Sequence, residues 1–171
     1  HPEVLVIVEG VETLLPDSPG TDKYWWGGNL KGVRDNPIEI ALDNKLVYSP
    51  HEYGPEVYVQ PWFKDYRFPG NLTYLWEDRF GFIYNEKIGH LFIGEFGIKN
   101  DKPGSVSNKW FEEWVDYVEE HEEGYSWTFW AWNPNSGDTG GILDNDWHAV
   151  HDWKIQKLQK IMAPMIGNKA D

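Results

Sequence analysis

The sequence predicts an α/β fold of four parallel strands joined by crossover helices, and three observations predict it. Four short apolar runs recur about every 35 to 45 residues, a spacing typical of strands that alternate with helices. The segments between and after the runs carry apolar residues at helical spacing. The chain has 171 residues and is 40% hydrophobic, which is enough for one core. We therefore expect residues 1–171 to form a single domain.

The expected strands are rich in β-branched, aliphatic and aromatic residues. They are VLVIV, LVYS, LFIG and WTFWAW, at residues 4–8, 46–49, 91–94 and 127–132. Strands that are buried on both faces of a parallel sheet read as continuous apolar runs of this kind. We expect all four to be buried, in this order along the chain.

The clearest helix is predicted over residues 106–124, where Gly124 can end it. Its apolar positions share one face: Val106, Trp110, Phe111, Trp114, Val115 and Val118. Residues 71–87 show a similar pattern despite Gly81, and residues 30–34 allow a short helix. Residues 151–167 predict a closing helix that kinks or ends near Pro164. Such helices join parallel strands by right-handed crossovers.

Composition excludes several classes of function. A formal net charge of −13 disfavours nucleic acid and anionic membrane surfaces as partners. No apolar run approaches the roughly 18 residues of a membrane helix. With no cysteine, the chain has no thiol nucleophile and no thiolate metal site.

Aromatic residues are unusually frequent: 11 Trp, 9 Tyr and 8 Phe. Many of the tryptophans stand among Gly and Asn. Their flat faces suit a ligand with alternating C–H and O–H groups, of which a sugar is the obvious example. The alternative is ordinary core packing, which we expect for most of these rings.

Unusual side chains follow each predicted strand. Glu9 follows the first run, His51 and Tyr53 the second, and Glu95 the third, while Trp130 falls within the last. In parallel α/β folds, ligands bind beyond the carboxyl ends of the strands, so these residues should converge on one cleft.

Glu95 is the strongest catalytic candidate, because LFIGEFG places it at a strand end between Gly94 and Gly97. The alternative is a glutamate paired with a nearby Arg or Lys. His51 and Tyr53 could orient a carboxylate or could simply pack in the core. His148 and His151 lack a convincing third ligand, so we expect no metal and no cofactor.

The segments YWWGGNL, LVYSPHEYGP, IGEFG and WTFWAWNPNSGDTGGIL resemble the C-terminal half of family 5 glycoside hydrolases, the endo-β-1,4-glucanases of the (β/α)8-barrel clan. The resemblance covers about residues 4–147 and keeps the family's order. It implies half of a TIM barrel, strands five to eight, from a secreted enzyme. The implied reaction is retaining hydrolysis of internal β-1,4-glucosidic bonds in cellulose or related β-glucans.

The resemblance also implies roles for individual residues. Glu95 matches the catalytic nucleophile, and Tyr53 the tyrosine that hydrogen-bonds it. The implied substrate contacts are His51, Trp130, Trp26, Tyr58 and Gln60.

The chain departs from the family pattern in one respect that bears on catalysis. It contains no Asn-Glu-Pro motif, where the family keeps its acid/base glutamate. Retaining glycosidases need two carboxyl groups about 5 Å apart. Glu9 is the best substitute acid in this chain and Glu52 the second, although Glu9 can equally be structural.

Four strands cannot close a barrel, so we expect a partner half-barrel, either a separate N-terminal half of the same enzyme or a second copy of this chain. Two functions stay open: an endoglucanase to which this chain supplies the nucleophile, and a catalytically inactive half-barrel that only binds β-glucan. A free-standing carbohydrate-binding module is disfavoured, because such modules are usually β-sandwiches.

Overall fold

The computed structural model describes residues 3–14, 22–100 and 102–164. In this part of the chain the main sheet has four parallel strands in the order β1-β4-β5-β6. The strands are β1 (Val6–Glu9), β4 (Leu46–Ser49), β5 (His90–Ile93) and β6 (Tyr125–Trp127). A separate antiparallel pair joins β2 (Thr13–Leu14) to β3 (Asp22–Lys23). The predicted parallel order of the four strands is confirmed.

The predicted bounds hold for β4 and shift by one residue for β5. The fourth strand differs most, because β6 ends at Trp127 rather than continuing to residue 132. Beyond it, the amide of Thr128 still bonds to the carbonyl of Ile93, but the amide of Trp130 bonds to that of Phe96 in the loop after β5. Trp130 therefore lies in an irregular segment beyond the strand.

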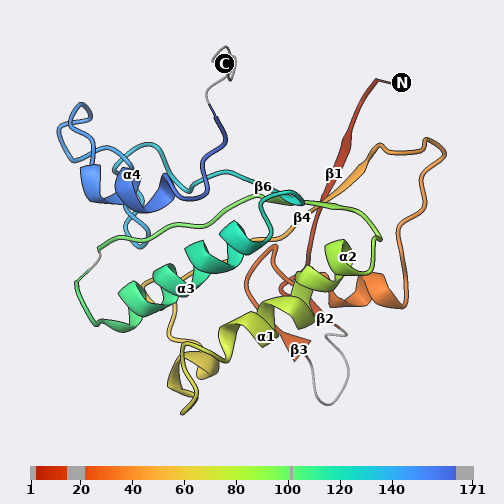
Figure 1. The fold of residues 1–171 in the computed structure, drawn as a ribbon, viewed down its shortest axis with the longest axis horizontal. Helices are drawn as coiled ribbons and strands as arrows, with labels where there is room; N and C mark the ends of the chain where they lie inside the picture. Colours follow the sequence, from red (N-terminus) through yellow and green to blue (C-terminus); the bar gives the residue numbers. More distant parts are fainter. Residues whose placement is uncertain (1–2, 15–21, 101, 165–171) are drawn as a thin grey trace.

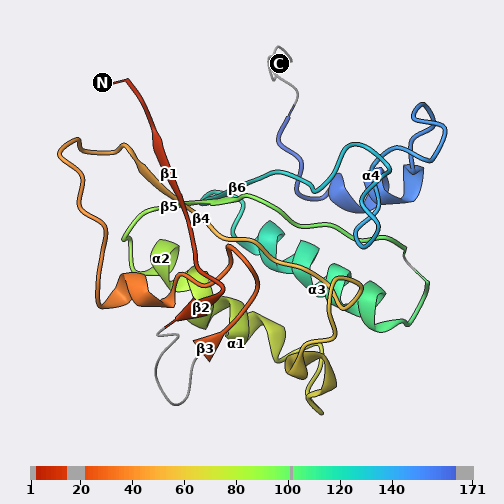
Figure 2. The same cartoon turned by 180° about the vertical axis from the view of Figure 1, so that it is seen from behind.

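Three helical segments cover one face of the sheet. The helices α1 (Leu72–Trp76), α2 (Phe82–Asn85) and α3 (Val106–Glu120) lie on the same side of the strands in both views (Figures 1 and 2). Leu91 and Ile93 are fully buried, whereas the alternate residue His90 is exposed and Phe92 half-buried. Successive side chains of a strand point to opposite faces, so the core lies between the sheet and these helices.

β1 is not buried, so that part of the prediction is wrong. Val6 and Ile7 are 40% and 53% exposed. The reason is that β1 stands at the edge of the sheet and pairs only with β4 in the described structure. Its flank therefore presents both backbone groups and apolar side chains to solvent.

The helix predicted over residues 71–87 is present, and it passes Gly81 through a π-helical turn, η3 (Glu77–Gly81), between α1 and α2. Such turns insert one extra residue per turn without ending the helix. Its buried face includes Leu72, Trp76, Phe80 and Ile83, all at 0% exposure. Two short 3-10 helices precede it, η1 (Lys31–Arg34) and η2 (Pro61–Lys64); η1 falls where residues 30–34 allowed a short helix.

α3 begins where the sequence predicts, because the Ser105 side chain accepts a hydrogen bond from the amide of Asn108 and caps the helix. Five of the six apolar positions predicted to share one face are buried. Val106, in the first turn, is the exception.

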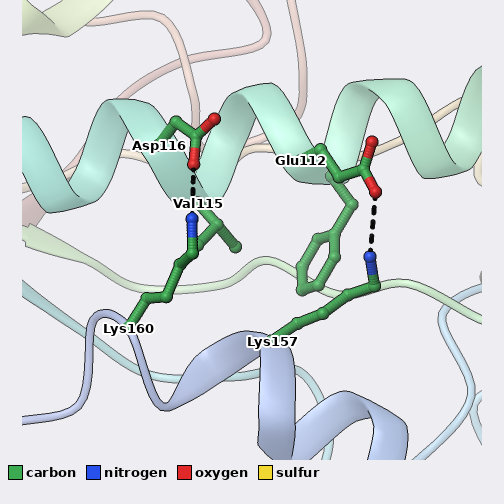
Figure 3. Close-up of a pocket in the computed structure, with 6 residues that line it drawn as sticks. Glu112, Val115, Asp116, Lys157 and Lys160 are labelled. Carbon is green, nitrogen blue, oxygen red and sulfur yellow. Dashed lines mark hydrogen bonds and ion pairs between the residues drawn. The ribbon is translucent and has the colours of Figure 1, made fainter.

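The closing helix is shorter than predicted: α4 (Asp152–Leu158) ends before Pro164, and residues 165–167 lie outside the described residues. The α4 segment packs beside α3, as Figure 3 shows. Lys157 pairs with Glu112 and Lys160 with Asp116, each at 3.1 Å, across a cavity of about 300 Å³. Because these charges already satisfy each other, we regard this cavity as a helix junction rather than a ligand site.

Candidate active site

The ends of β4 and β5 stay in register for several residues past the strands. The amide of Gly94 donates to the carbonyl of Pro50 at 3.0 Å, and the amide of Glu52 to that of Glu95 at 3.0 Å. An isolated parallel bridge pairs His51 with Glu95. This pairing sets the two loops side by side at the carboxyl end of the sheet.

Three side chains predicted from the strand ends meet there. The hydroxyl of Tyr53 donates a hydrogen bond to Oε2 of Glu95 and lies 3.2 Å from Nδ1 of His51. Nδ1 of His51 is 3.8 Å from the same carboxylate oxygen. Burial, followed by the hydrogen bond to Glu95, raises the pKa of Tyr53. Tyr53 therefore keeps its proton and serves as a donor to Glu95.

Glu9 approaches the same group from β1. Its Oε1 lies 3.7 Å from Nε2 of His51, so the imidazole has a carboxylate near each nitrogen. The two carboxylates differ in environment, because the Glu9 side chain is 59% exposed and that of Glu95 26%.

The glycines on either side of Glu95 make room for its neighbours. A Cβ on Gly94 would lie 2.6 Å from Oγ of Ser49 and 2.8 Å from Nε2 of His51. A Cβ on Gly97 would overlap the carbonyl oxygen of Trp130. Glycine is thus needed at both positions for the strand-end loops to close around the carboxylate.

Glu95 opens into a cavity of about 350 Å³. The walls are largely aromatic, as expected for a sugar-binding cleft. The lining residues are Trp25, Trp26, Tyr53, Val57, Glu95, Trp130, Asp138 and Thr139. Trp26 and Trp130 keep 71% and 47% of their surface exposed and can present ring faces to a ligand.

Not every candidate lines this cavity. Tyr58 and Gln60 are absent from its wall, although Val57 next to them belongs to it, and His51 and Glu9 are absent as well. Asp138 and Thr139 are lining residues that the sequence analysis missed. The signal available for them was NSGDTGG, a polar, Gly-rich loop directly after the last strand run.

Glu52, the second candidate for the missing acid, does not face the cavity. Its side chain is fully buried and bonds to the Tyr24 hydroxyl and the Trp110 indole. Burial raises the pKa of this carboxyl to about 7, and the two donors act in the opposite direction. A side chain with no access to substrate cannot protonate a leaving group, so this candidacy is wrong.

Within residues 3–14, 22–100 and 102–164, no cluster of three or more His, Asp or Glu side chains is arranged to hold a metal ion. Among the helices of that same part, none is long and apolar enough to cross a membrane.

A model of the family described as "Cellulase (glycosyl hydrolase family 5)" matches residues 1–136. The chain belongs to glycosyl hydrolase family 5. An endoglucanase of Paenibacillus polymyxa is 40% identical over 167 residues, which cover 98% of this chain and 41% of the relative. The major extracellular endoglucanase of Xanthomonas campestris pv. campestris is 38% identical over 162 residues, covering 94% of this chain and 32% of that protein.

A solved structure gives the same family and the fold. An endocellulase from Pyrococcus horikoshii, in a complex with cellotetraose, superposes with a TM-score of 0.82 and 39% identity. The match covers 93% of this chain and 43% of that one. The chain therefore spans less than half the length of these family 5 relatives, and the predicted half-barrel fold is confirmed.

Proposed function

We propose that this family 5 chain supplies the nucleophile and part of the sugar-binding wall of a retaining endo-β-1,4-glucanase. The observation that carries the proposal is the setting of Glu95: a partly exposed carboxylate at a strand end, held by Tyr53 and facing an aromatic cleft. A carboxylate oriented by one hydrogen bond keeps its other oxygen available for attack.

The chemistry follows from this arrangement. The free oxygen of Glu95 attacks the anomeric carbon, the glycosidic C–O bond breaks, and an acid protonates the departing oxygen. Water then attacks the glycosyl-enzyme ester at the same carbon and gives its proton to the conjugate base of that acid, which restores both the acid and the Glu95 carboxylate. Tyr53 holds the nucleophile throughout.

The proposed substrate is a β-1,4-glucan. Trp26 and Trp130 offer exposed ring faces for glucosyl units, and the exposed carboxylate of Asp138 can accept hydrogen bonds from their hydroxyl groups. We assign His51, which is 3% exposed and touches Tyr53, to support of the Glu95 group from behind the cleft wall, and Tyr58 and Gln60 to the leaving-group side. The cellotetraose bound to the Pyrococcus horikoshii relative supports this substrate class.

The acid is the unassigned component. Glu9 is the candidate within this chain, since it reaches His51 from β1. The Glu9 side chain is 59% exposed at the open edge of the sheet and is not part of the cavity wall. This exposure favours an acid supplied by a second half-barrel.

Exposed apolar residues at both edges of the sheet are evidence for such a partner. Val4, Leu5, Val6 and Ile7 are between 40% and 54% exposed along the open flank of β1. At the other edge, a groove of about 780 Å³ runs beside β6 and includes Tyr125, Trp127, Ile161 and Met162. Open parallel edges with apolar flanks call for a covering chain. We propose an N-terminal half-barrel of the same enzyme or a second copy of this chain.

Light scattering on the purified chain separates these two partners. A mass near twice 20.0 kDa supports self-association, whereas a monomer that becomes a one-to-one complex with an added N-terminal half-barrel supports the other partner. A monomer that binds neither contradicts the pairing.

The second candidate function is a half-barrel that binds β-glucan without cleaving it, and the exposure of Glu9 favours it when the chain acts alone. In either case we propose that the protein acts outside the cell, as the name of the Xanthomonas campestris relative states for that protein.

Reducing-sugar release from carboxymethylcellulose tests the proposal, with the parent chain compared with Glu95→Gln. Activity that Glu95→Gln abolishes supports the enzyme and makes Glu9→Gln the next variant. Two inactive proteins that bind cellotetraose equally well support the binding function. Activity that survives in Glu95→Gln contradicts Glu95 as the nucleophile.

A further inference from the structure

Side chains alternate along the segment that follows β4. His51 and Tyr53 reach toward Glu95, as their contacts show, whereas the carboxyl of Glu52 between them is 0% exposed and bonds elsewhere. An extended backbone sends successive side chains to opposite sides, which explains the arrangement. The proposed mechanism makes no use of the Glu52 carboxyl. Burying a carboxyl costs free energy unless hydrogen bonds compensate for its lost hydration, so the partners of Glu52 matter.

The buried carboxyl joins three parts of the fold. The hydroxyl of Tyr24, which directly follows β3, donates to one oxygen of Glu52. The indole N–H of Trp110, in α3, donates to the other oxygen at 2.9 Å. Tyr24 and Trp110 are themselves 2% and 0% exposed, so water does not compete for these bonds.

Both Glu52 and its partner Tyr24 are connected to residues that line the cleft. The amide of Glu52 donates to the carbonyl of Glu95, so the position of Glu52 sets that of the nucleophile's backbone. Tyr24 precedes Trp25 and Trp26, both of which line the cavity. The Trp25 ring packs edge-on against Tyr53 with 5.7 Å between centroids.

We propose that Glu52 is a positioning residue, whose bonds to Tyr24 and Trp110 hold the aromatic wall of the cleft in register with Glu95 and Tyr53. The inference deepens the function proposed for Glu95 and rests on it. Glu52 touches no substrate, so its effect reaches the sugar only through the segments that it joins.

A matched pair of tyrosine variants separates positioning from general stabilisation. Tyr24→Phe removes the hydroxyl that bonds to Glu52, and Tyr117→Phe removes one that bonds to Glu77 at 2.7 Å and lies 2.9 Å from the Tyr125 hydroxyl. Both tyrosines are 2% exposed and both donate to a glutamate, but Tyr117 lies on α3 and lines no part of the cleft cavity. Both substitutions should lower the melting temperature, and Tyr117→Phe by at least as much as Tyr24→Phe, because it breaks two buried contacts.

Calorimetric titration with cellotetraose then gives the readout. We expect Tyr24→Phe to weaken binding at least fivefold and Tyr117→Phe to leave it within twofold of the parent. Equal effects of the two variants, or none from Tyr24→Phe, would overturn the inference and leave Glu52 as a fold stabiliser.

Conservative replacement at Glu52 is the second test. In Glu52→Gln, the amide can accept from Trp110 and donate to Tyr24, so binding should stay within about threefold of the parent. Glu52→Leu leaves both donors without a partner, and binding should fall at least tenfold. Equal binding by the two variants contradicts positioning by hydrogen bonds.

The parent chain distinguishes failure of this inference from failure of the proposed function. If the parent binds cellotetraose and the variants bind it equally well, the positioning role of Glu52 is contradicted and the proposed function is not. If the parent itself fails to bind cellotetraose, both the proposed function and the role of Glu52 are contradicted.

Discussion

The phenolic hydroxyl of Tyr53 donates a hydrogen bond to one carboxylate oxygen of Glu95. The same hydroxyl lies 3.2 Å from Nδ1 of His51, so the nucleophile proposed here belongs to a hydrogen-bonded group, and no Arg or Lys among the described residues forms an ion pair with it. A carboxylate held in this way has one defined direction of attack.

Loss of the Tyr53–Glu95 hydrogen bond should slow nucleophilic attack by Glu95 with little effect on substrate binding. Tyr53→Phe removes a hydrogen bond to a charged group, which contributes about 1.5–3 kcal/mol. We expect glycosylation by an aryl β-cellobioside with a good leaving group to slow about 10- to 100-fold, while cellotetraose affinity changes less than threefold. Tyr66→Phe, at a tyrosine that is 93% exposed, serves as the control. An unchanged rate in Tyr53→Phe would contradict the orienting role.

The exposed rings of the cleft should account for much of the sugar affinity. Removing either platform, in Trp26→Ala or Trp130→Ala, should weaken cellotetraose binding about tenfold, because each indole loses a broad contact face. Tyr74→Ala is a suitable control, since Tyr74 is 79% exposed on α1 and does not line the cavity. Calorimetric titration checks this, and affinity that is insensitive to both tryptophans would mean that the glucan binds elsewhere.

Glu52 should make stability depend on pH. Burial gives its carboxyl a pKa of about 7 in the folded chain, against 4.5 for the ordinary side chain. Between these values the folded chain keeps a proton that the unfolded chain has lost, so the free energy of unfolding falls as the pH rises. The facing groups are Tyr24 and, over the Tyr24 ring at 5.4 Å, Arg79.

Urea unfolding at several pH values measures this effect. The stability of the parent relative to Glu52→Gln should be highest below pH 4.5 and fall by on the order of 3 kcal/mol by pH 7 to 8. Taking the difference between the two proteins cancels the other titrating groups. A difference that is constant with pH would contradict the raised pKa.

Lys154 should hold the loop after the last strand. It is 0% exposed, and its ammonium donates to the carbonyls of Gly141 at 2.7 Å and Thr139 at 3.3 Å. Lys154→Met leaves these carbonyls without their donor, and we expect a loss of about 1–3 kcal/mol in stability and weaker cellotetraose binding. Lys160→Met removes only exposed ion pairs, with Asp116 and Glu119, and should cost less than about 1 kcal/mol. Thermal unfolding of the two variants compares them directly, and equal losses would contradict the assigned role of Lys154.

Much of the fold could be predicted because local pattern and burial agree. The run LVYS predicted β4 residue by residue, and the apolar face of α3 predicted where that helix begins, although the helix ends at Glu120, four residues before Gly124. The burial of β1 was wrongly predicted, since an apolar run does not reveal whether a neighbouring strand covers it. The end of β6 was also missed, because WTFWAW stays apolar beyond the point where regular pairing stops.

Some residues of the candidate site could be predicted from the sequence and others could not. Strand-end positions in a parallel sheet predicted that Glu95, His51 and Tyr53 would meet, and they do. Asp138 and Thr139 were not predicted, because they come from a loop whose path depends on long-range contacts such as those of Lys154. The burial of Glu52 required knowledge of Tyr24 and Trp110, which stand 28 and 58 residues away in the sequence.

Covalent trapping tests the central claim most directly. An aryl 2-deoxy-2-fluoro-β-cellobioside with a dinitrophenolate leaving group needs no acid to depart, so the chain can be tested whether or not it holds one. After incubation and proteolysis, mass spectrometry should find one fluorocellobiosyl adduct, on Glu95, and none in Glu95→Gln. An adduct on Glu9 or another carboxylate, or none in a parent chain that binds cellotetraose, would contradict Glu95 as the nucleophile.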